Sequence, residues 1–221
     1  MDDPHNTGAI IPMSAWLFLL LAVVGSSTHA FATDSLEIGC ARLELVLDSR
    51  FEPSVVEREW ASGAPRDEAP AILRLRGCAG ELLDHLTLDA PLARLDPSPL
   101  RGAPAPTYLV SEDLTAPAGS YSGPLTLPIQ VVNGRLKRVL AKSDGHFEPI
   151  RLALTGKAAW KKVAVGAVDD ILSVSCEPKD HGFVIRYTRY HPTRRYWKVR
   201  MRSELGFWES DGEFPELRRF P

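Results

Sequence analysis

The stretch Ile129-Gln-Val-Val-Asn-Gly-Arg-Leu-Lys-Arg-Val-Leu140 places Asn133-Gly134 between two apolar-rich runs. Asn-Gly is the strongest short-range signal for a β-hairpin, because a type I′ turn needs positive φ at both central residues. The stretch therefore predicts two antiparallel strands joined by a two-residue turn. Outward from this hairpin, the dominant period of the apolar residues is likewise two rather than 3.6.

Alternating apolar and polar residues predict further half-buried strands. In residues 41–48, one alanine and three leucines face one way, and Arg42, Glu44 and Asp48 face the other. Residues 71–76 alternate in the same manner. The sequence therefore predicts a mainly β fold of antiparallel sheets, either sandwich-like or as two small β lobes, with at most one or two short helices.

Two finer expectations concern the second half of the chain. Residues 177–182 are expected to form a loop that joins strands at 171–176 and 183–190, and one short helix is expected around residues 157–163. A Pro-rich stretch at residues 97–106 is the best candidate linker between lobes 33–96 and 107–221.

An apolar block from Ala15 to Gly25, followed by Ala30-Phe-Ala32, is typical of a secretory signal peptide. We expect a cleaved signal helix within residues 1–32, cut after Ala30 or Ala32, and a periplasmic or secreted mature domain at 33–221 without a stable membrane span. Residues 1–32 contain no Lys or Arg, so Met13 is an alternative start. An uncleaved membrane anchor and a buried core helix are the competing interpretations.

The charge balance limits the class of partner. The chain has 26 basic and 28 acidic residues, and removal of residues 1–32 takes away two acids and no bases, leaving 26 of each. A near-neutral mature domain disfavours a uniformly basic nucleic-acid binder. No cofactor-binding or catalytic motif is present, so no cofactor is expected.

All three cysteines, Cys40, Cys78 and Cys176, follow the predicted signal peptide, and an oxidising compartment permits disulfides there. Spacing alone does not choose among the three pairings. We favour Cys40 with Cys78, because both lie in the N-terminal half beside strand-like runs. No C-x-x-C motif is present, so no metal site is expected.

One constellation stands out from this background, the stretch Val184 to Arg202, with seven bases, four aromatic residues and no acid. It predicts a hairpin turning near residues 191–194, with Arg186 and Thr188 on the same face as Lys198, Arg200 and Arg202. Guanidinium groups bind carboxylate or phosphate and tyrosine rings stack on sugars, so an anionic envelope polymer or glycan is the expected ligand. The candidate binding residues are Arg186, Arg189, Tyr190, Arg194, Arg195, Tyr196, Lys198 and Arg200.

Competing interpretations stay open. The stretch can equally be a solvated strand face whose bases pair with neighbouring acids. A secreted hydrolase would need a site near His181 and Asp180, and the pair Asp169-Asp170 could ligate a cation. A small inhibitor or chaperone-like partner protein predicts an exposed apolar patch near three aromatic residues, Trp208, Phe214 and Phe220.

Four strings in the second half of the chain carry a resemblance. They are Gly119-Ser-Tyr-Ser-Gly-Pro124, Ile171-Leu-Ser-Val-Ser-Cys176, Arg186-Tyr-Thr-Arg-Tyr190 and Gly206-Phe-Trp-Glu-Ser-Asp-Gly-Glu-Phe-Pro215. In these strings the chain resembles a group of uncharacterised bacterial exported proteins. The resemblance implies a location in the bacterial envelope and no particular activity. The sequence thus favours an exported, non-catalytic binding or structural module.

Overall fold

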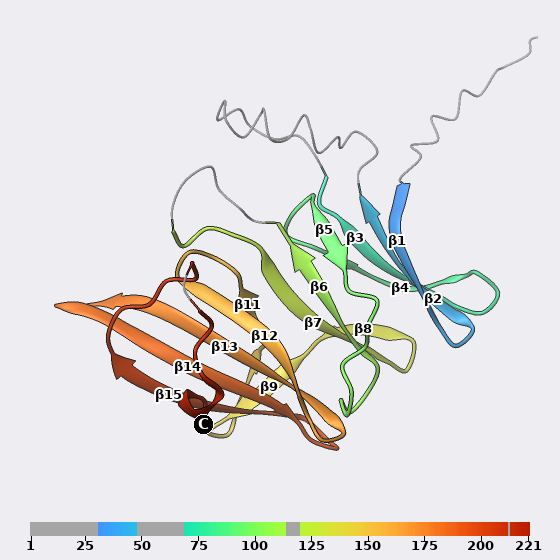
Figure 1. Cartoon of the computed structure of the whole chain (residues 1–221). Helices are drawn as coiled ribbons and strands as arrows, with labels where there is room; N and C mark the ends of the chain where they lie inside the picture. The colour runs from blue at the N-terminus through green and yellow to red at the C-terminus, as the bar shows by residue number, and fades with distance from the viewer. Residues whose placement is uncertain (1–30, 48–68, 114–119, 212) are drawn as a thin grey trace, which may run out of the picture.

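The computed structural model describes residues 31–47, 69–113, 120–211 and 213–221 (Figure 1). These residues form fifteen strands in three sheets, and their one helical element is the short 3-10 helix η1, Leu217–Arg219. The predicted mainly β fold is confirmed. The predicted signal helix lies outside the described residues.

The three sheets are built from the following strands. The first sheet has the antiparallel order β1-β2-β3-β4, with β1 at Phe31–Ile38, β2 at Ala41–Leu47, β3 at Ile72–Arg76 and β4 at Leu82–Thr87. The second has the order β11-β7-β6-β5 with β8 beside β7, where β5 is Ala93–Leu95, β6 Thr107–Glu112, β7 Leu125–Val132, β8 Arg135–Arg138 and β11 Leu152–Ala153. The third has the order β10-β9-β15-β14-β13-β12, where β9 is Leu140–Ser143, β10 His146–Pro149, β12 Ala158–Val165, β13 Val168–Lys179, β14 Gly182–Pro192 and β15 Trp197–Leu205.

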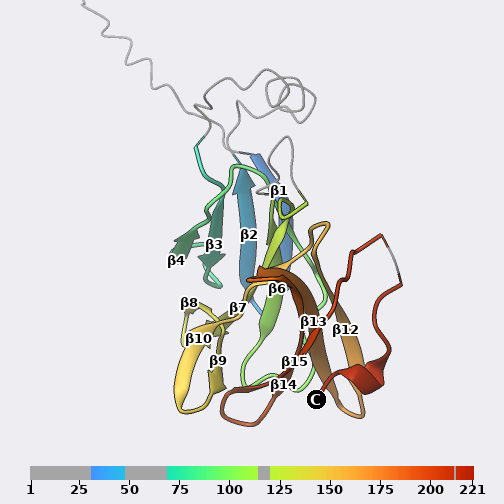
Figure 2. The ribbon, with the colours of Figure 1, turned by 90° about the vertical axis from the view of Figure 1, so that its left-hand side faces the viewer.

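The second sheet lies between the other two. In Figures 1 and 2, β6 and β7 separate the sheet of β1–β4 from the sheet of β12–β15. Alternate residues of the central strands point to opposite faces, so Val110 and Ile129 enter one core while Leu109 enters another. Both faces of β6 are therefore buried.

The predicted hairpin around Asn133-Gly134 is confirmed. Strands β7 and β8 pair in antiparallel register from Val132 opposite Arg135, and the two turn residues have φ of 52° and 70°. These are the positive values that a type I′ turn requires, and Asn and Gly adopt them more readily than other residues.

The first and second sheets are joined at both edges by aspartates. Asp34 of β1 accepts a hydrogen bond from the backbone nitrogen of Leu95 at 3.2 Å, and Asp84 of β4 accepts one from Leu136 at 2.8 Å. The Leu136 hydrogen bond lowers the pKa of the Asp84 carboxyl. These contacts close the edges around a leucine-rich core that includes Leu43, Leu45, Leu73, Leu75 and Leu127.

The chain after β15 folds back over the outer face of the third sheet. Phe220 is 7% exposed and packs edge-on against Tyr187, with 5.4 Å between ring centroids. Lys157, only 6% exposed, bonds Glu209 and lies 3.7 Å from the centroid of the Phe207 ring. Trp208, Phe214 and Phe220 thus pack against a core of the chain itself. The inhibitor or chaperone-like alternative stays a prediction.

The helix expected around residues 157–163 is wrong. This stretch lies in β12, which pairs with β13 along its whole length from Ala158 opposite Ser175. Alanine and lysine favour helices in isolation, but Ala158 and Ala159 are each 9% exposed here. Tertiary packing has therefore overridden the local preference.

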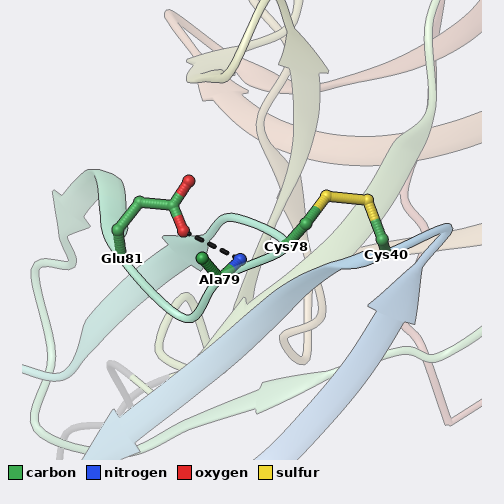
Figure 3. The surroundings of a disulfide bond; sticks show 4 residues. All are labelled: Cys40, Cys78, Ala79 and Glu81. Carbon is green, nitrogen blue, oxygen red and sulfur yellow. Dashed lines mark hydrogen bonds between the residues drawn. A yellow bond between two sulfur atoms is a disulfide. The ribbon is translucent and has the colours of Figure 1, made fainter.

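A disulfide joins Cys40 to Cys78, as predicted, and Cys176 is a buried free thiol (Figure 3). Cys40 follows β1 and Cys78 follows β3, so the bridge connects turns at one end of the first sheet. Beside it, the Glu81 carboxylate accepts a hydrogen bond from the backbone nitrogen of Ala79 at 3.1 Å.

The Pro-rich stretch 97–106 is anchored in the fold. Leu100 is 4% exposed in the core between the second and third sheets, and Arg101 binds Asp169 through its backbone nitrogen and its guanidinium group. Strand β5 before the stretch pairs with β6 after it. The division into lobes 33–96 and 107–221 stays a prediction.

Replacing both Cys40 and Cys78 with Ser should lower the free energy of unfolding by about 2–4 kcal/mol, because the unfolded chain gains the entropy that the bridge removes. Urea denaturation measures the difference. A reducing agent should destabilise the natural chain to a similar degree and leave the double variant unchanged. Equal stability of the oxidised natural chain and the double variant would contradict the prediction.

Glu112 supplies a second test of stability. Its side chain is fully buried, one oxygen accepts a hydrogen bond from the backbone nitrogen of Asp89 at 2.9 Å, and the other has no partner among the described residues. Burial raises the pKa of the Glu112 carboxyl. The folded state therefore binds this proton more tightly than the unfolded state, so stability should fall as pH rises above the ordinary glutamate pKa and level off above the folded value.

Glu112→Gln should remove this loss of stability. The free energy of unfolding of the variant minus that of the natural chain should therefore increase from acid to neutral pH. Denaturation at a series of pH values measures the slope. The matched control is Glu148→Gln on β10, where every residue is exposed. A pH slope unchanged by Glu112→Gln would contradict the interpretation.

Candidate anion-binding site

The register of the third sheet gathers basic side chains on its outer face. His191 of β14 lies opposite Lys198 of β15, Arg189 lies opposite Arg200, and Lys198 lies opposite Lys142 of β9. Opposed residues in neighbouring strands point to the same face. We name these five residues, from three strands, the basic face.

Four members of the basic face, Arg189, His191, Lys198 and Arg200, line a pocket of about 200 Å³. Among the residues that the structure describes, no carboxylate belongs to this lining. The volume suits one small charged group with part of the unit that carries it, and cations converging from two strands favour a carboxylate, sulfate or phosphate there.

A buried carboxylate holds two of the lining side chains. Asp170 of β13 is fully buried, and its two oxygens bind Arg189 Nε at 2.5 Å and His191 Nδ1 at 2.7 Å. This bonding uses one ring nitrogen of His191 and leaves Nε2 for another partner. Asp170 therefore acts as a positioning residue beneath the pocket.

Aromatic rings lie at the β9–β10 side of the basic face. Phe147 of β10 is opposite Lys142, and its ring meets that of Tyr196 edge-on at 6.4 Å between centroids. Lys142 Nζ lies 5.8 Å from the Phe147 centroid and 5.6 Å from that of Tyr196. Phe147 is 53% exposed, so the rings offer an apolar surface beside the cations.

The structure separates the eight predicted binding residues into three sets. Arg189, Lys198 and Arg200 line the pocket. Arg194, Arg195 and Tyr196 are exposed in the adjoining turn. Arg186 and Tyr190 lie on the opposite face, where Arg186 bonds Glu177 at 3.2 Å and Tyr190 packs against the core between the second and third sheets. Burial raises the pKa of Tyr190.

The prediction that Arg186 and Thr188 share a face with Lys198 and Arg200 is therefore wrong. The turn lies at residues 193–196, where the Thr193 hydroxyl group donates a hydrogen bond to the Tyr196 carbonyl at 2.6 Å. Pro192 consequently pairs with Trp197, and Lys198 and Arg200 fall opposite His191 and Arg189 rather than on the face of Arg186. Opposed residues share a face, so Arg186 and Thr188 lie with Ser203 and Met201 instead.

Four residues of this site, His191, Asp170, Lys142 and Phe147, were not among the predicted binding residues, and Asp170 was expected only as a cation ligand. A sequence signal could have revealed the first pair, because Asp180 and Gly182 are residues that favour tight turns. Asp180 has φ of 33° in a two-residue turn between Lys179 and Gly182, so β13 and β14 extend through the expected loop. Pairing the residues of the two strands outward from that turn, starting with Lys179 opposite Gly182, places Asp170 opposite His191.

Two other expected sites are not assembled. Asp169 and Asp170 bind Arg101 and Arg189 respectively, and as neighbours in a strand they point to opposite faces, which contradicts a shared cation site. Asp180 and His181 are exposed at the two-residue turn. Among the described residues, no group of three or more His, Cys, Asp or Glu side chains could hold a metal ion.

Comparisons with known proteins identify no relative: no family model matches the chain, and neither a curated protein nor a solved structure does. In the described part of the chain, no helix is long and apolar enough to cross a membrane.

Asp170→Asn should lower the free energy of unfolding by about 2–4 kcal/mol, because it removes the buried negative charge that pairs with Arg189 and also bonds His191. Thermal or urea denaturation measures the loss. Glu177→Gln is the matched control, since it breaks an exposed pair with Arg186 and should cost less than about 1 kcal/mol. Equal effects of the two substitutions would contradict a structural role for Asp170.

Proposed function

We propose that this chain is an exported bacterial envelope protein that binds an anionic polymer or glycan through the basic face, without catalysing a reaction. The observation that carries the proposal is the pocket lined by Arg189, His191, Lys198 and Arg200. Asp170 holds Arg189 and His191 of β14 in place, so these two side chains need little reordering to bind an anion.

The surroundings of the pocket favour a polymer over a single small anion. Arg194 and Arg195 extend positive charge into the adjoining turn, and Lys142 extends it to β9. Phe147 and Tyr196 add rings against which sugar units could stack. A chain with repeated negative charges can contact several of these groups at once, whereas a small anion fills the pocket alone.

Export is part of the proposal. The Cys40–Cys78 disulfide fits an oxidising compartment, and the apolar block followed by Ala30-Phe-Ala32 supplies a route to it. Between the two predicted cleavage positions we favour the one after Ala30, because β1 begins at Phe31 and keeps all of its residues. Outside the cell, nucleic acid is an improbable partner, which favours an acidic envelope polysaccharide.

The double variant Lys198→Glu with Arg200→Glu should lose salt-sensitive retention on immobilised dextran sulfate or a polyuronate. Both side chains are exposed, so the charge reversal should affect binding more than folding. Retention of the natural chain should fall with increasing salt, because ions screen exposed charges.

The control reverses the same residue types on the other face, as Lys179→Glu with Arg186→Glu. Both residues are exposed on β13 and β14, on the face opposite the pocket. This control should elute close to the natural chain. The proposal fails if both double variants lose retention equally, since net charge alone would then explain binding, or if neither does.

A further inference from the structure

Strand β15 has an open edge over most of its length. On one side it pairs with β14 from Trp197 to Leu205, but on the other side β9 pairs only with Trp197 and Lys198. Residues 199–205 therefore have a strand neighbour on one side only, within the part of the chain that the structure describes. Figure 1 shows β15 at the border of its sheet, with β9 meeting it at one end.

The pattern of backbone hydrogen bonds identifies which residues face this edge. Gly206 donates to the Phe183 carbonyl at 3.1 Å and Thr193 donates to the Tyr196 carbonyl at 2.9 Å. Hydrogen-bonded pairs alternate along antiparallel strands, so Arg200, Arg202 and Glu204 bond β14 through their backbones. Val199, Met201, Ser203 and Leu205 direct their N–H and C=O groups to the open edge.

The same edge exposes apolar side chains. Met201 is 52% exposed and Leu205 is 85% exposed, and both lie on the face opposite the basic face. A strand edge with unpaired backbone groups and exposed apolar residues is a template for pairing with another strand.

We propose that the β15 edge pairs antiparallel with the β15 edge of a second copy of this chain, centred on Ser203. In this register Met201 of each copy lies opposite Leu205 of the other, and Arg202 lies opposite Glu204. Two apolar pairs and two ion pairs therefore form around the two-fold axis. Each type of cross-strand pair stabilises an antiparallel sheet.

Neighbouring registers are disfavoured by charge. Centring the pair on Met201 places Arg200 opposite Arg202, and centring it on Arg202 places two Arg202 side chains together. Centring it on Glu204 opposes two Glu204 side chains. Like charges directly opposite one another destabilise a strand pair. The sequence of β15 thus selects one register with a second copy of itself.

The dimer would join the third sheets of two copies into one continuous sheet. Opposed residues share a face, so both basic faces would lie on the same side of it. Two sites facing one way would hold a long anionic polymer more tightly than one, a consequence that rests on the proposed function. The dimer itself does not depend on that function.

Ser203→Pro tests the dimer, because it removes an N–H group that faces the open edge and leaves the bonds to β14 in place. Proline is tolerated on edge strands for this reason. Sedimentation velocity over a concentration series should show dimers for the natural chain, with the dissociation constant raised about tenfold or more by Ser203→Pro. Ser203→Thr, which keeps the N–H group, is the matched control and should dimerise like the natural chain.

Arg202→Glu gives a second test, since it would oppose two pairs of glutamates in the dimer and should also weaken it about tenfold or more. A natural chain that stays monomeric at every concentration would overturn the inference, as would dimerisation unaffected by both Ser203→Pro and Arg202→Glu. Retention on dextran sulfate is scored separately. If the proposed function fails because the two charge-reversal double variants behave alike, sedimentation still decides whether the dimer exists.

Discussion

Burial of β6 on both faces is the constraint on which the rest of the structure depends. Val110 packs toward the sheet of β1–β4 and Leu109 toward the sheet of β9, β15, β14 and β13, so one short strand contributes to two cores. A strand in that position must be paired on both sides, and β5 and β7 provide the partners. The outer sheets can then each keep one face for other uses.

The outer face of the third sheet has two parts, a covered apolar part and the basic face. Toward one end, Tyr187 and Val174 are covered by the returning C-terminal segment through Phe220. Toward the other end, β14 and β15 carry Arg189 and Lys198, which line the pocket. Asp170 has no exposed surface and supplies the negative charge that lets Arg189 be held near this core. The basic face thus depends on a buried ion pair that its strand pattern does not reveal.

Local signals predicted the elements that local interactions determine. Asn133-Gly134 specified its hairpin because few other residue pairs accept positive φ twice, and the alternation in Ala41–Leu47 specified β2. Strand β12 could not be predicted, since its residues favour a helix until β13 pairs with them. The hairpin of β14 and β15 was expected, but its faces were misassigned, because alternation within each strand does not establish which residues of the two strands lie opposite one another. Contacts between distant residues, such as Asp170 with His191, require that register first.

The disulfide closes part of the chain into a covalent loop. Cys40 and Cys78 enclose β2, β3 and the whole connection between them in one loop. A single cut of the backbone anywhere inside that loop would leave two fragments still tied together, and the antiparallel pairing of β2 with β3 would hold their strands in place. Such a nicked molecule would migrate as one species under oxidising conditions and come apart only when the bridge is reduced and the sheet denatured.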